Sequence, residues 1–408
     1  MNILVINQPL RNRGDESAHK ALIRKIKSQI PSASVRVLFI KSNSPDSISQ
    51  FDVHLSDVTY INSEIPLYGL LLRLYKLHLS LLMFLHPFFV MNMWTHYRWA
   101  DAVVCAPGGI CMGGFQNWGH IFELYVAKLA RKPLLYFGRS FGPFPTVTKA
   151  NRLFKKRSME LLNYFSFISI RDKKTEAIAE ELGITYTSTV DSAFLDSTTV
   201  ELPYELRYFN SMDNYMVFVP NLLLWHFAYK GKFEIEDVLS FYTHMARIIL
   251  EQDKSQKIVM LPQTFQYRMK YENDVDLFRE IACRINDDRV IVLPDCYSSD
   301  IQQKIISRSN YVVGARYHSI VFAINQNIPF VSLSYEHKMS GLLETLQMTE
   351  TMIDISHTLE TSESRNRCLK EFKELISELT HDKSLQDKAK KIAEQAFESF
   401  HKVLMSVE

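Results

Sequence analysis

The sequence predicts an α/β protein of two domains, each built on a parallel sheet. Its 408 residues exceed what one hydrophobic core usually supports. Short apolar runs alternate with helical patterns, which is typical of a parallel sheet with helices on both faces. The alternation stops at a polar stretch, residues 196–213, and then begins again. The restart indicates a second domain, and the polar stretch is the expected linker.

The first half is expected to contain five strands separated by helices. Its opening residues, MNILVIN, form a short β-rich run, and SVRVLFI forms the next. A helix is expected over residues 18–30, with Asp15 or Ser17 as its N-cap. The expected strands are residues 1–7, 34–40, 102–106, 134–137 and 167–170.

The second half repeats this arrangement. Helical patterns at residues 238–252 and 274–286 separate apolar runs, and another helix is expected to begin near Tyr317. The expected strands are residues 215–219, 257–261, 290–293, 311–313 and 330–333.

The chain is expected to end in a helical tail. After Gly341 it becomes charged, and two stretches carry apolar residues at helical spacing. The predicted organisation is therefore a first domain at residues 1–195, a second at 196–345, and a tail at 346–408 whose helices pack back on the domains.

Composition excludes several classes of protein. A net charge of +2 argues against bulk binding of nucleic acid. Five cysteines without a CxxC pair are typical of reduced thiols in a cytosolic protein. The N-terminus lacks a basic region before its apolar run, so it is interpreted as a strand and not as a signal peptide. No GxGxxG follows the first strand, and no P-loop, HExxH or metal-ligand cluster is present, so neither a nucleotide cofactor nor a metal is expected.

One segment differs from the rest in composition. The 21 residues from Leu77 to Tyr97 contain no Asp, Glu, Lys or Arg. Core or lid helices are one interpretation. Another is a patch that dips into a bilayer surface, with Arg73, Lys76 and Arg98 near its ends. A membrane-spanning helix is a third, weakened by Pro87 and by three histidines.

Glycines gather after two strands of the first half. Seven of the 13 glycines lie between Gly108 and Gly142, in PGGICMGGFQNWG and GRSFGPF. Ligands of open α/β sheets bind beyond the carboxyl ends of strands, where glycine allows close backbone approach. Either a binding cleft or tight structural turns account for them. Trp118 would then either stack on a sugar face or pack in the core.

A polar pair stands where a strand of the second half meets a helix, in GARYHS. Gly314 allows a turn, and the N–H groups that open the following helix form a site for anions. Arg316 is suited to clamp a phosphate or carboxylate. The helix N-terminus disfavours a cationic His318, so a bound anion would hold its proton and make it a general acid. Alternatively, Arg316 bonds sheet carbonyls and His318 caps the helix.

Two further polar groups follow strands. LSYEHKMSG adds Lys338 at the same expected sheet edge as Arg316. RNRGDES, after the first strand, places Asp15 and Glu16 at a helix start, where either capping or ligand binding explains them.

Eight short motifs together resemble the polysaccharide pyruvyl transferase family. They extend from the first strand to about Gly341, and the RxH of GARYHS with the YxxK of LSYEHK is the strongest element. The motifs are NRGDE (12–16), APGGICMGG (106–114), GRSFGPF (138–144), SIRD (169–172), DSAF (191–194), LPQT (261–264), GARYHSIVFAINQNIPF (314–330) and LSYEHK (333–338).

This resemblance implies two Rossmann-like domains facing a cleft, similar to GT-B glycosyltransferases. It implies transfer of pyruvate from phosphoenolpyruvate to a pair of saccharide hydroxyls as a ketal, without a cofactor, in capsule or exopolysaccharide synthesis. His318 and Arg316 are then the catalytic pair. The expected donor-binding residues are Arg316, Lys338, Arg139, Gly314 and Ser319, and the expected acceptor-binding residues are Asp15, Glu16, Gly108, Gly109 and Trp118.

One departure from the family is visible. Members often carry an arginine at the end of the first strand of the second domain, whereas here that strand reads YMVFVPNLLLW. Donor binding is then expected to depend more on Arg316, Lys338 or Arg139.

Two other functions fit the pattern. One is a GT-B glycosyltransferase whose anion site holds the diphosphate of a nucleotide sugar. The other is a glycan-binding module without turnover. The expected location is the cytoplasm, with peripheral contact at the inner membrane face if the acceptor is lipid-linked.

Overall fold

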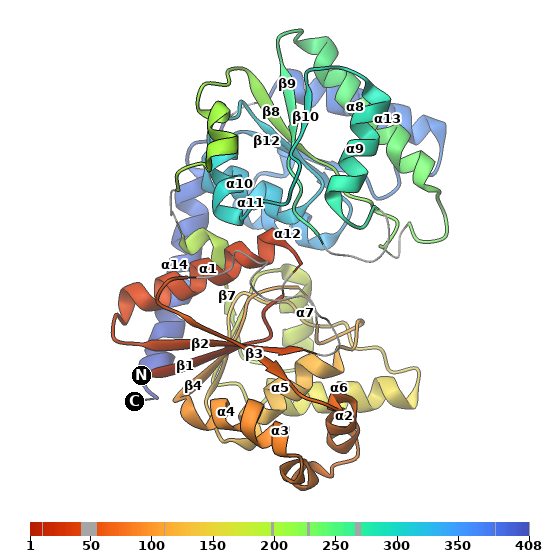
Figure 1. The fold of residues 1–408 in the computed structure, drawn as a ribbon. Helices are drawn as coiled ribbons and strands as arrows, with labels where there is room; N and C mark the ends of the chain where they lie inside the picture. The colour runs from red at the N-terminus through yellow and green to blue at the C-terminus, as the bar shows by residue number, and fades with distance from the viewer. Residues whose placement is uncertain are drawn as a thin grey trace. The chain divides into compact units, whose positions relative to one another are not determined.

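The computed structural model describes residues 1–9, 11–41, 55–109, 111–196, 200–226, 229–265, 271–379 and 381–407. It divides into two compact units, which are described separately (Figure 1). The first unit comprises Met1–Leu10, Ala18–Asp196 and Lys390–Glu408. The second comprises Arg11–Ser17 and Ser197–Ala389. The segment Arg11–Ser17 therefore packs with the second unit although strands of the first unit flank it in sequence.

The first unit is built on a parallel sheet of seven strands in the order β3-β2-β1-β4-β5-β6-β7. The side chains of β4 are buried on both faces of the sheet, as in other parallel sheets covered by helices. The strands are β1 (Asn2–Ile6), β2 (Ser34–Lys41), β3 (Thr59–Glu64), β4 (Ala102–Cys105), β5 (Leu134–Tyr136), β6 (Phe167–Ile170) and β7 (Thr187–Ser188).

Helices cover both faces of this sheet. In Figure 1, α1 lies on one side of the strands and α4 on the other. The helices are α1 (Arg13–Gln29), α2 (Tyr68–Lys76), η2 (Ser80–Leu85), α3 (Pro87–Phe89), η3 (Val90–Trp94), α4 (Thr95–Trp99), α5 (Trp118–Leu129), α6 (Lys149–Leu162), α7 (Lys173–Glu181) and η4 (Ser192–Leu195).

The end of the C-terminal helix α14 (Leu385–Met405) belongs to this unit. The ring of Phe400 lies 5.4 Å from that of Phe137 and 5.6 Å from that of Phe167. Lys25 of α1 forms an ion pair with Glu394 at 2.6 Å. The end of α14 is therefore a core element of the first unit, whereas the preceding part of the expected tail, residues 346–389, belongs to the second.

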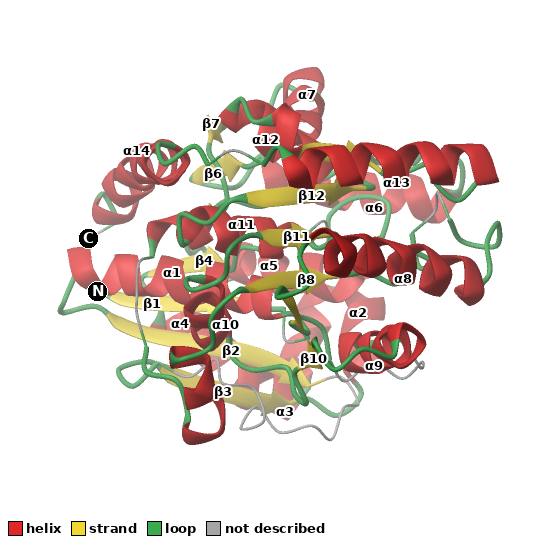
Figure 2. Cartoon of the chain, turned by 90° about the horizontal axis from the view of Figure 1, so that it is seen from above, coloured by secondary structure: helices red, strands yellow, loops and turns green. Residues whose placement is uncertain are grey.

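The second unit has a parallel sheet of six strands in the order β10-β9-β8-β11-β12-β13. Figure 2 shows α13 running beside α8, and Arg365 bonds Asp237 between them at 3.3 Å. The elements are η5 (Tyr204–Asn210), β8 (Tyr215–Val219), α8 (Ile235–Gln252), β9 (Lys257–Met260), α9 (Asp274–Ile285), β10 (Val290–Val292), α10 (Ser299–Ile306), β11 (Val312–Gly314), α11 (Tyr317–Asn325), β12 (Phe330–Ser334), α12 (His337–Leu346), η6 (Thr349–Thr351), β13 (Met352–Asp354) and α13 (Ser362–Ser377).

The predicted fold class is confirmed, since each unit is an α/β domain built on a parallel sheet. Three strands were missed: β3, β7 and β13. β3 reads TYINSE, and only one of its six residues is buried. β7 has two residues and β13 has three. The linker expected at residues 196–213 was predicted to be irregular, but η5 forms part of it. Its residues 197–199 lie outside the described residues.

Each sheet reverses its strand order once, between β1 and β4 and between β8 and β11. Helices leave in opposite directions at such a reversal, so the carboxyl ends of the two strands open a crevice where ligands bind. The residues that follow β1, β4, β8 and β11 are therefore the candidates for a site.

Candidate functional site

The turn after β11 sets the geometry of the GARYHS motif. Gly314 ends the strand, and Arg316 occupies the N-cap position of α11. A Cβ on Gly314 would stand 2.0 Å from the hydroxyl oxygen of Ser319, which donates a hydrogen bond to the Arg316 carbonyl at 2.5 Å. Gly314 and Ser319, both expected at the donor, thus build the turn that presents Arg316.

Arg316 is held by side chains of the second unit. Its Nε donates to Asp274 Oδ1 at 3.1 Å, its terminal nitrogen forms an ion pair with the same oxygen, and that nitrogen also donates to Thr264 Oγ1 at 3.0 Å. Asp274 is fully buried and accepts further bonds from the Gln263 and Thr264 N–H groups at 2.8 and 2.9 Å. The carboxylate therefore fixes the orientation of the guanidinium.

Arg316 lines a pocket of about 300 Å³. One wall of this pocket is formed by the loop that follows β8. Trp225 of this loop is 41% exposed, and its indole N–H donates to Asn221 Oδ1 at 3.1 Å. This loop is where the family's second arginine was expected, and here it supplies an aromatic surface. Asn12, Leu222, Trp225, Thr264, Glu272 and Arg316 line the pocket.

Lys338 lies in the first turn of α12, beyond β12. Its ammonium group is 3.7 Å from the carboxylate of Glu336. Near them, the ring of His226 packs against that of Tyr335 at 5.5 Å, and burial lowers the pKa of His226 while the charge of Glu336 opposes that shift. Lys338 thus belongs to the same sheet edge as Arg316, but its charge is partly balanced by Glu336.

His318 lies in the first turn of α11 and is 6% exposed. It packs against Gly14, at the start of α1: a Cβ on Gly14 would stand 1.9 Å from Nδ1 of His318. The absence of a side chain at Gly14 makes room for this imidazole.

The segment around Gly14 is fastened to the second unit. Arg13 donates to the Cys296 carbonyl from Nε at 2.8 Å, and Glu16 accepts from the Ser299 hydroxyl at 3.0 Å. Arg13 and Glu16 also pair with each other at 2.6 Å. Glu16, expected at the acceptor, is an anchor that places Gly14 against His318, and the partly buried Asp15 lies beside it in the same helical turn.

Helix α1 begins before both of the caps expected from the sequence. Asn12 accepts the Gly14 N–H at 2.8 Å through its side chain, and the helix starts at Arg13. Asn12 also bridges to Thr264 and lines the Arg316 pocket. The expected caps, Asp15 and Ser17, lie inside the helix because the Asn12 side chain already accepts the N–H of Gly14 in the first turn.

A second polar site lies in the first unit, beyond β1, β4 and β5. Arg139 is buried and donates to the carbonyl oxygens of Ala106 at 2.5 Å and Gly109 at 3.1 Å. A Cβ on Gly108 would meet the Arg139 side chain at 3.3 Å. Arg139, expected at the donor, therefore joins its own glycine loop, GRSFGPF, to the loop that contains Gly108 and Gly109.

Arg139 also lines a pocket of about 310 Å³ in the first unit. His120 is buried there, and among the described residues its Nε2 has no hydrogen-bond partner. Burial, aided by the charge of Arg139, lowers the pKa of His120 well below its usual value. Burial raises the pKa of Glu123 to about 8. Both side chains line the pocket, together with Asn7, Tyr68 and Asn117.

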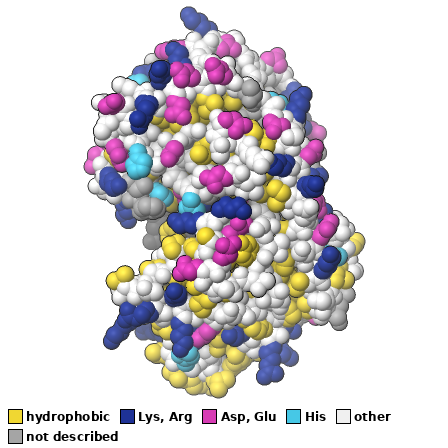
Figure 3. All heavy atoms as spheres, turned by 180° about the vertical axis from the view of Figure 1, so that it is seen from behind, with side chains coloured by type: hydrophobic (Ala, Val, Ile, Leu, Met, Phe, Trp, Pro, Cys, Tyr) yellow, Lys and Arg dark blue, Asp and Glu magenta, His cyan; other side chains and the backbone are white. Residues whose placement is uncertain are grey.

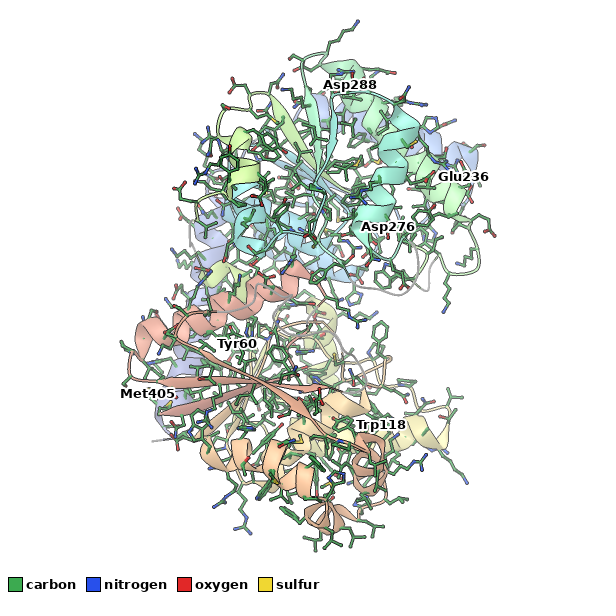
Figure 4. All side chains as sticks on the ribbon, viewed as in Figure 1. Tyr60, Trp118, Glu236, Asp276, Asp288 and Met405 are labelled. Carbon is green, nitrogen blue, oxygen red and sulfur yellow. The ribbon has the colours of Figure 1, made fainter. Side chains whose placement is uncertain are left out.

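Trp118 does not line this pocket. Its ring packs against Tyr75 of α2 at 6.3 Å and Phe154 of α6 at 5.1 Å, and the ammonium of Lys76 lies 4.3 Å from its centre (Figure 4). Trp118 is half-buried against the first unit's core, and its role at a sugar stays a prediction.

The structure thus distributes the predicted site residues over its two units. Asp15, Glu16, Gly314, Arg316, His318, Ser319 and Lys338 belong to the second unit, and Gly108, Gly109, Trp118 and Arg139 to the first. Sequence reasoning missed Asn12, Asp274, Trp225, His120 and Glu123. Asp274 carried a signal, as an acid opening the helix after the strand-end motif LPQT.

Over the part of the chain that the structure describes, no group of three His, Cys, Asp or Glu side chains is arranged to hold a metal ion.

Residues 12–337 match the model of the polysaccharide pyruvyl transferase family. The chain belongs to this family. The match extends from Asn12 to His337 and includes Gly14, Asp274, Arg316 and His318.

One curated relative is the amylovoran biosynthesis protein AmsJ of Erwinia amylovora, 23% identical over 253 residues. The alignment covers 58% of this chain and 57% of AmsJ, so the chain spans little more than half the length of this relative.

Solved structures share the fold at low identity. A putative UDP-N-acetylglucosamine 2-epimerase of Listeria monocytogenes aligns with 96% of this chain and 91% of its own, at a TM-score of 0.55 and 12% identity. TcCGT1, solved in complex with UDP, aligns with 100% of this chain and 98% of its own, at a TM-score of 0.57 and 9% identity. These likenesses confirm the fold class, two Rossmann-like parallel-sheet domains as in GT-B-like proteins.

Proposed function

We propose that this family member transfers pyruvate from phosphoenolpyruvate to two hydroxyls of a saccharide, forming a ketal and releasing phosphate. One observation carries the proposal: Arg316 and His318 stand together at the start of α11, in a chain whose residues 12–337 match the pyruvyl transferase family.

Arg316 is the main donor-binding group in this proposal. Its guanidinium lines the second unit's pocket and is oriented by Asp274. A planar guanidinium is suited to the phosphate or carboxylate of phosphoenolpyruvate, and the dipole of α11, which begins next to Arg316, adds to the attraction. Lys338 supplies a further cation at this sheet edge, and the exposed face of Trp225 covers the methylene side of the donor.

His318 is the proposed proton donor. Protonation of the methylene carbon of phosphoenolpyruvate makes its C2 an oxocarbenium-like centre, which a first saccharide hydroxyl attacks. The C2–O bond to phosphate then breaks, and a second hydroxyl forms the ketal. Of the two hydroxyl protons, one replaces the proton that His318 gave to carbon and the other leaves with phosphate. Cationic side chains around the phosphate stabilise its departure.

We propose the first unit's pocket as the acceptor side. It offers a neutral imidazole on His120, a protonated carboxyl on Glu123 and the amides of Asn7 and Asn117. Apart from Arg139, whose guanidinium donates to the backbone carbonyls of Ala106 and Gly109, these donors and acceptors are uncharged and suit saccharide hydroxyls better than an anion. In its ionised form, which a pKa of about 8 makes accessible near neutral pH, Glu123 is also suited to accept a hydroxyl proton.

The acceptor that we propose is a saccharide of a capsule or exopolysaccharide, carried on a lipid at the cytoplasmic face of the membrane. The family description names polysaccharide, and AmsJ is a biosynthesis protein for amylovoran. A lipid-linked acceptor would bring the enzyme to a bilayer surface as a peripheral protein. This agrees with the membrane contact expected for the segment from Leu77 to Tyr97.

The test is phosphate release from phosphoenolpyruvate in the presence of lipid-linked saccharide fractions, with ketal formation followed by mass spectrometry. We expect His318→Ala to lower kcat by about 100-fold or more, the usual contribution of a general acid. His244→Ala, an exposed histidine of the same unit, is the matched control. Normal turnover by His318→Ala would remove His318 from the mechanism.

The same assay distinguishes pyruvate transfer from the alternative function, a glycosyltransferase that uses a nucleotide sugar. A glycosyltransferase would release a nucleoside diphosphate from a nucleotide sugar and leave phosphoenolpyruvate unchanged. Consumption of a nucleotide sugar with phosphoenolpyruvate inert would therefore overturn the proposed function.

A further inference from the structure

The segment between Leu67 and Met91 carries most of the exposed large hydrophobic side chains in the described chain. Nine of the fifteen such side chains lie there. Leu81 and Leu85 are 79% and 80% exposed, and Leu67, Leu77 and Met91 are exposed to a similar degree. We call these nine side chains the apolar cap. Soluble monomers rarely expose so many neighbouring apolar side chains without a binding partner.

The apolar cap is held rigidly by its inner side. Met83, Phe89, Met93 and Tyr97 alternate with the exposed residues and are fully buried in the first unit's hydrophobic core. The backbone of this part is also bonded to the sheet side, where Ser63 donates to the Asn92 carbonyl at 2.5 Å. The outward face is therefore a fixed feature of the fold.

The charged residues within the segment that carries the apolar cap have one sign. Residues 65–100 contain no Asp or Glu, and their charged residues are Arg73, Lys76 and Arg98. Arg73 and Arg98 are exposed. In Figure 3 a yellow area of hydrophobic side chains occupies the lower end of the molecule, with Lys and Arg on both sides of it. Such a surface complements anionic lipid headgroups.

The polar groups in this segment favour lipid over a protein partner. Asn92 donates to the Glu64 carbonyl at 2.9 Å, and the Thr95 hydroxyl donates to the Met91 carbonyl at 2.8 Å. A protein interface of standard size forms about ten direct hydrogen bonds, whereas Asn92 and Thr95 each donate a bond within the unit. Lipid acyl chains require no such bonds.

The geometry also determines how the segment would meet a bilayer. None of the helices in the described chain is both long and apolar enough to cross a membrane. The cap is built from α2, η2, α3 and η3, of which α2 is the longest at nine residues, whereas a spanning helix needs about 20. Short helices with one apolar face lie in the plane of the interface.

We propose that the apolar cap docks this protein on the surface of a lipid bilayer that carries anionic headgroups. The leucines of η2 enter the acyl boundary, and Arg73 and Arg98 contact headgroups. This docking is independent of the transfer reaction, because it requires neither phosphoenolpyruvate nor a saccharide.

The experiment is co-sedimentation of the full chain with vesicles of phosphatidylcholine alone or mixed with phosphatidylglycerol. We expect wild type to pellet with the mixed vesicles and less with the neutral ones. The double variant Leu81→Asn/Leu85→Asn should lower the partition coefficient at least about tenfold, because two leucines lose their apolar burial. Phe115→Asn/Val147→Asn removes two exposed apolar side chains elsewhere in the same unit and should pellet like wild type.

Two results would overturn the proposal. In one, wild type stays in the supernatant at saturating vesicle concentrations, or the leucine variant pellets equally. In the other, sedimentation velocity shows a dimer that Leu81→Asn/Leu85→Asn makes monomeric while vesicle binding is absent, which would mean that a second copy covers the cap. Thermal unfolding of both double variants verifies that the exposed substitutions leave the fold intact.

Discussion

Gly14 and His318 lie in such close contact that residue 14 has no room for a side chain. A Cβ there would stand 1.9 Å from Nδ1 and 2.0 Å from Cγ of the imidazole. The contact joins the start of α1 to the start of α11, and Arg13 and Glu16 secure it through Cys296 and Ser299. The backbone at Gly14 thus determines where the proposed proton donor lies.

Gly14→Ala should therefore lower turnover by at least about tenfold and lower the free energy of unfolding by about 1–3 kcal/mol, as overpacking does. Alanine is otherwise preferred over glycine in a helix by about 1 kcal/mol, so helix propensity predicts the opposite sign. Phosphate release and denaturant unfolding measure the two effects.

Gly69→Ala is the matched control for this substitution. Gly69 is also the second residue of a helix, but a Cβ there meets nothing within 4 Å. We expect it to be neutral or slightly stabilising. Equal losses in both variants would contradict the contact with His318.

Asp274 orients Arg316, so its charge should matter for donor binding. Asp274→Asn preserves the shape of the side chain but removes the ion pair, and breaking a buried pair costs roughly 3–5 kcal/mol of stability. We expect the KM for phosphoenolpyruvate to rise more than kcat falls. Asp276→Asn, in the same first turn of α9 (Figure 4), should change neither value. An unchanged KM in Asp274→Asn would show that Arg316 needs no orienting partner.

Glu123 should make the stability of the first unit depend on pH. Burial raises the pKa of its carboxyl in the folded state to about 8, well above that of an unfolded glutamate. Between these two values the unfolded chain has lost the proton and the folded chain retains it. The free energy of unfolding therefore falls as pH rises from about 4.5 to about 8, by up to about 1.4 kcal/mol per pH unit, and is constant above that range.

Glu123→Gln should remove this dependence, and at pH 8 and above it should be more stable than wild type. Denaturant unfolding from pH 5 to pH 9 measures the effect, with the exposed Glu181→Gln as control. If Glu123 also serves the acceptor, the variant should raise the KM for the saccharide and leave binding of phosphoenolpyruvate unchanged. Parallel pH profiles for wild type and Glu123→Gln would refute the raised pKa of the Glu123 carboxyl.

The C-terminal helix α14 should be indispensable to the first unit. Phe400 is fully buried between Phe137 and Phe167, so Phe400→Ala should cost about 3–5 kcal/mol. Met405→Ala, on an exposed position of the same helix (Figure 4), should cost less than about 1 kcal/mol. Similar midpoints of denaturant unfolding for wild type and Phe400→Ala would mean that α14 does not stabilise the first unit.

Much of the fold could be predicted because long apolar strands alternate with amphipathic helices. Strands such as β8 and β12 are buried throughout and stand out as apolar runs. The strands that were missed are short or polar and lie at or next to sheet edges, where hydrogen bonding to a neighbouring strand defines them more than hydrophobicity does.

The site was harder to predict because it depends on contacts between distant parts of the chain. Arg316 and His318 were found through their position after a strand. Their supports, Asp274 and Gly14, are distant in sequence, and no local pattern connects them to the motif. Arg139 illustrates the converse: a conspicuous arginine in a glycine loop whose bonds go to backbone carbonyls within its own unit.

A crystal structure with phosphoenolpyruvate bound tests the central claim most directly. We predict that its phosphate or carboxylate lies within hydrogen-bond distance of the Arg316 guanidinium, with its methylene carbon facing the His318 imidazole. An anion bound instead in the first unit's pocket, beside Arg139 and His120, would contradict the account.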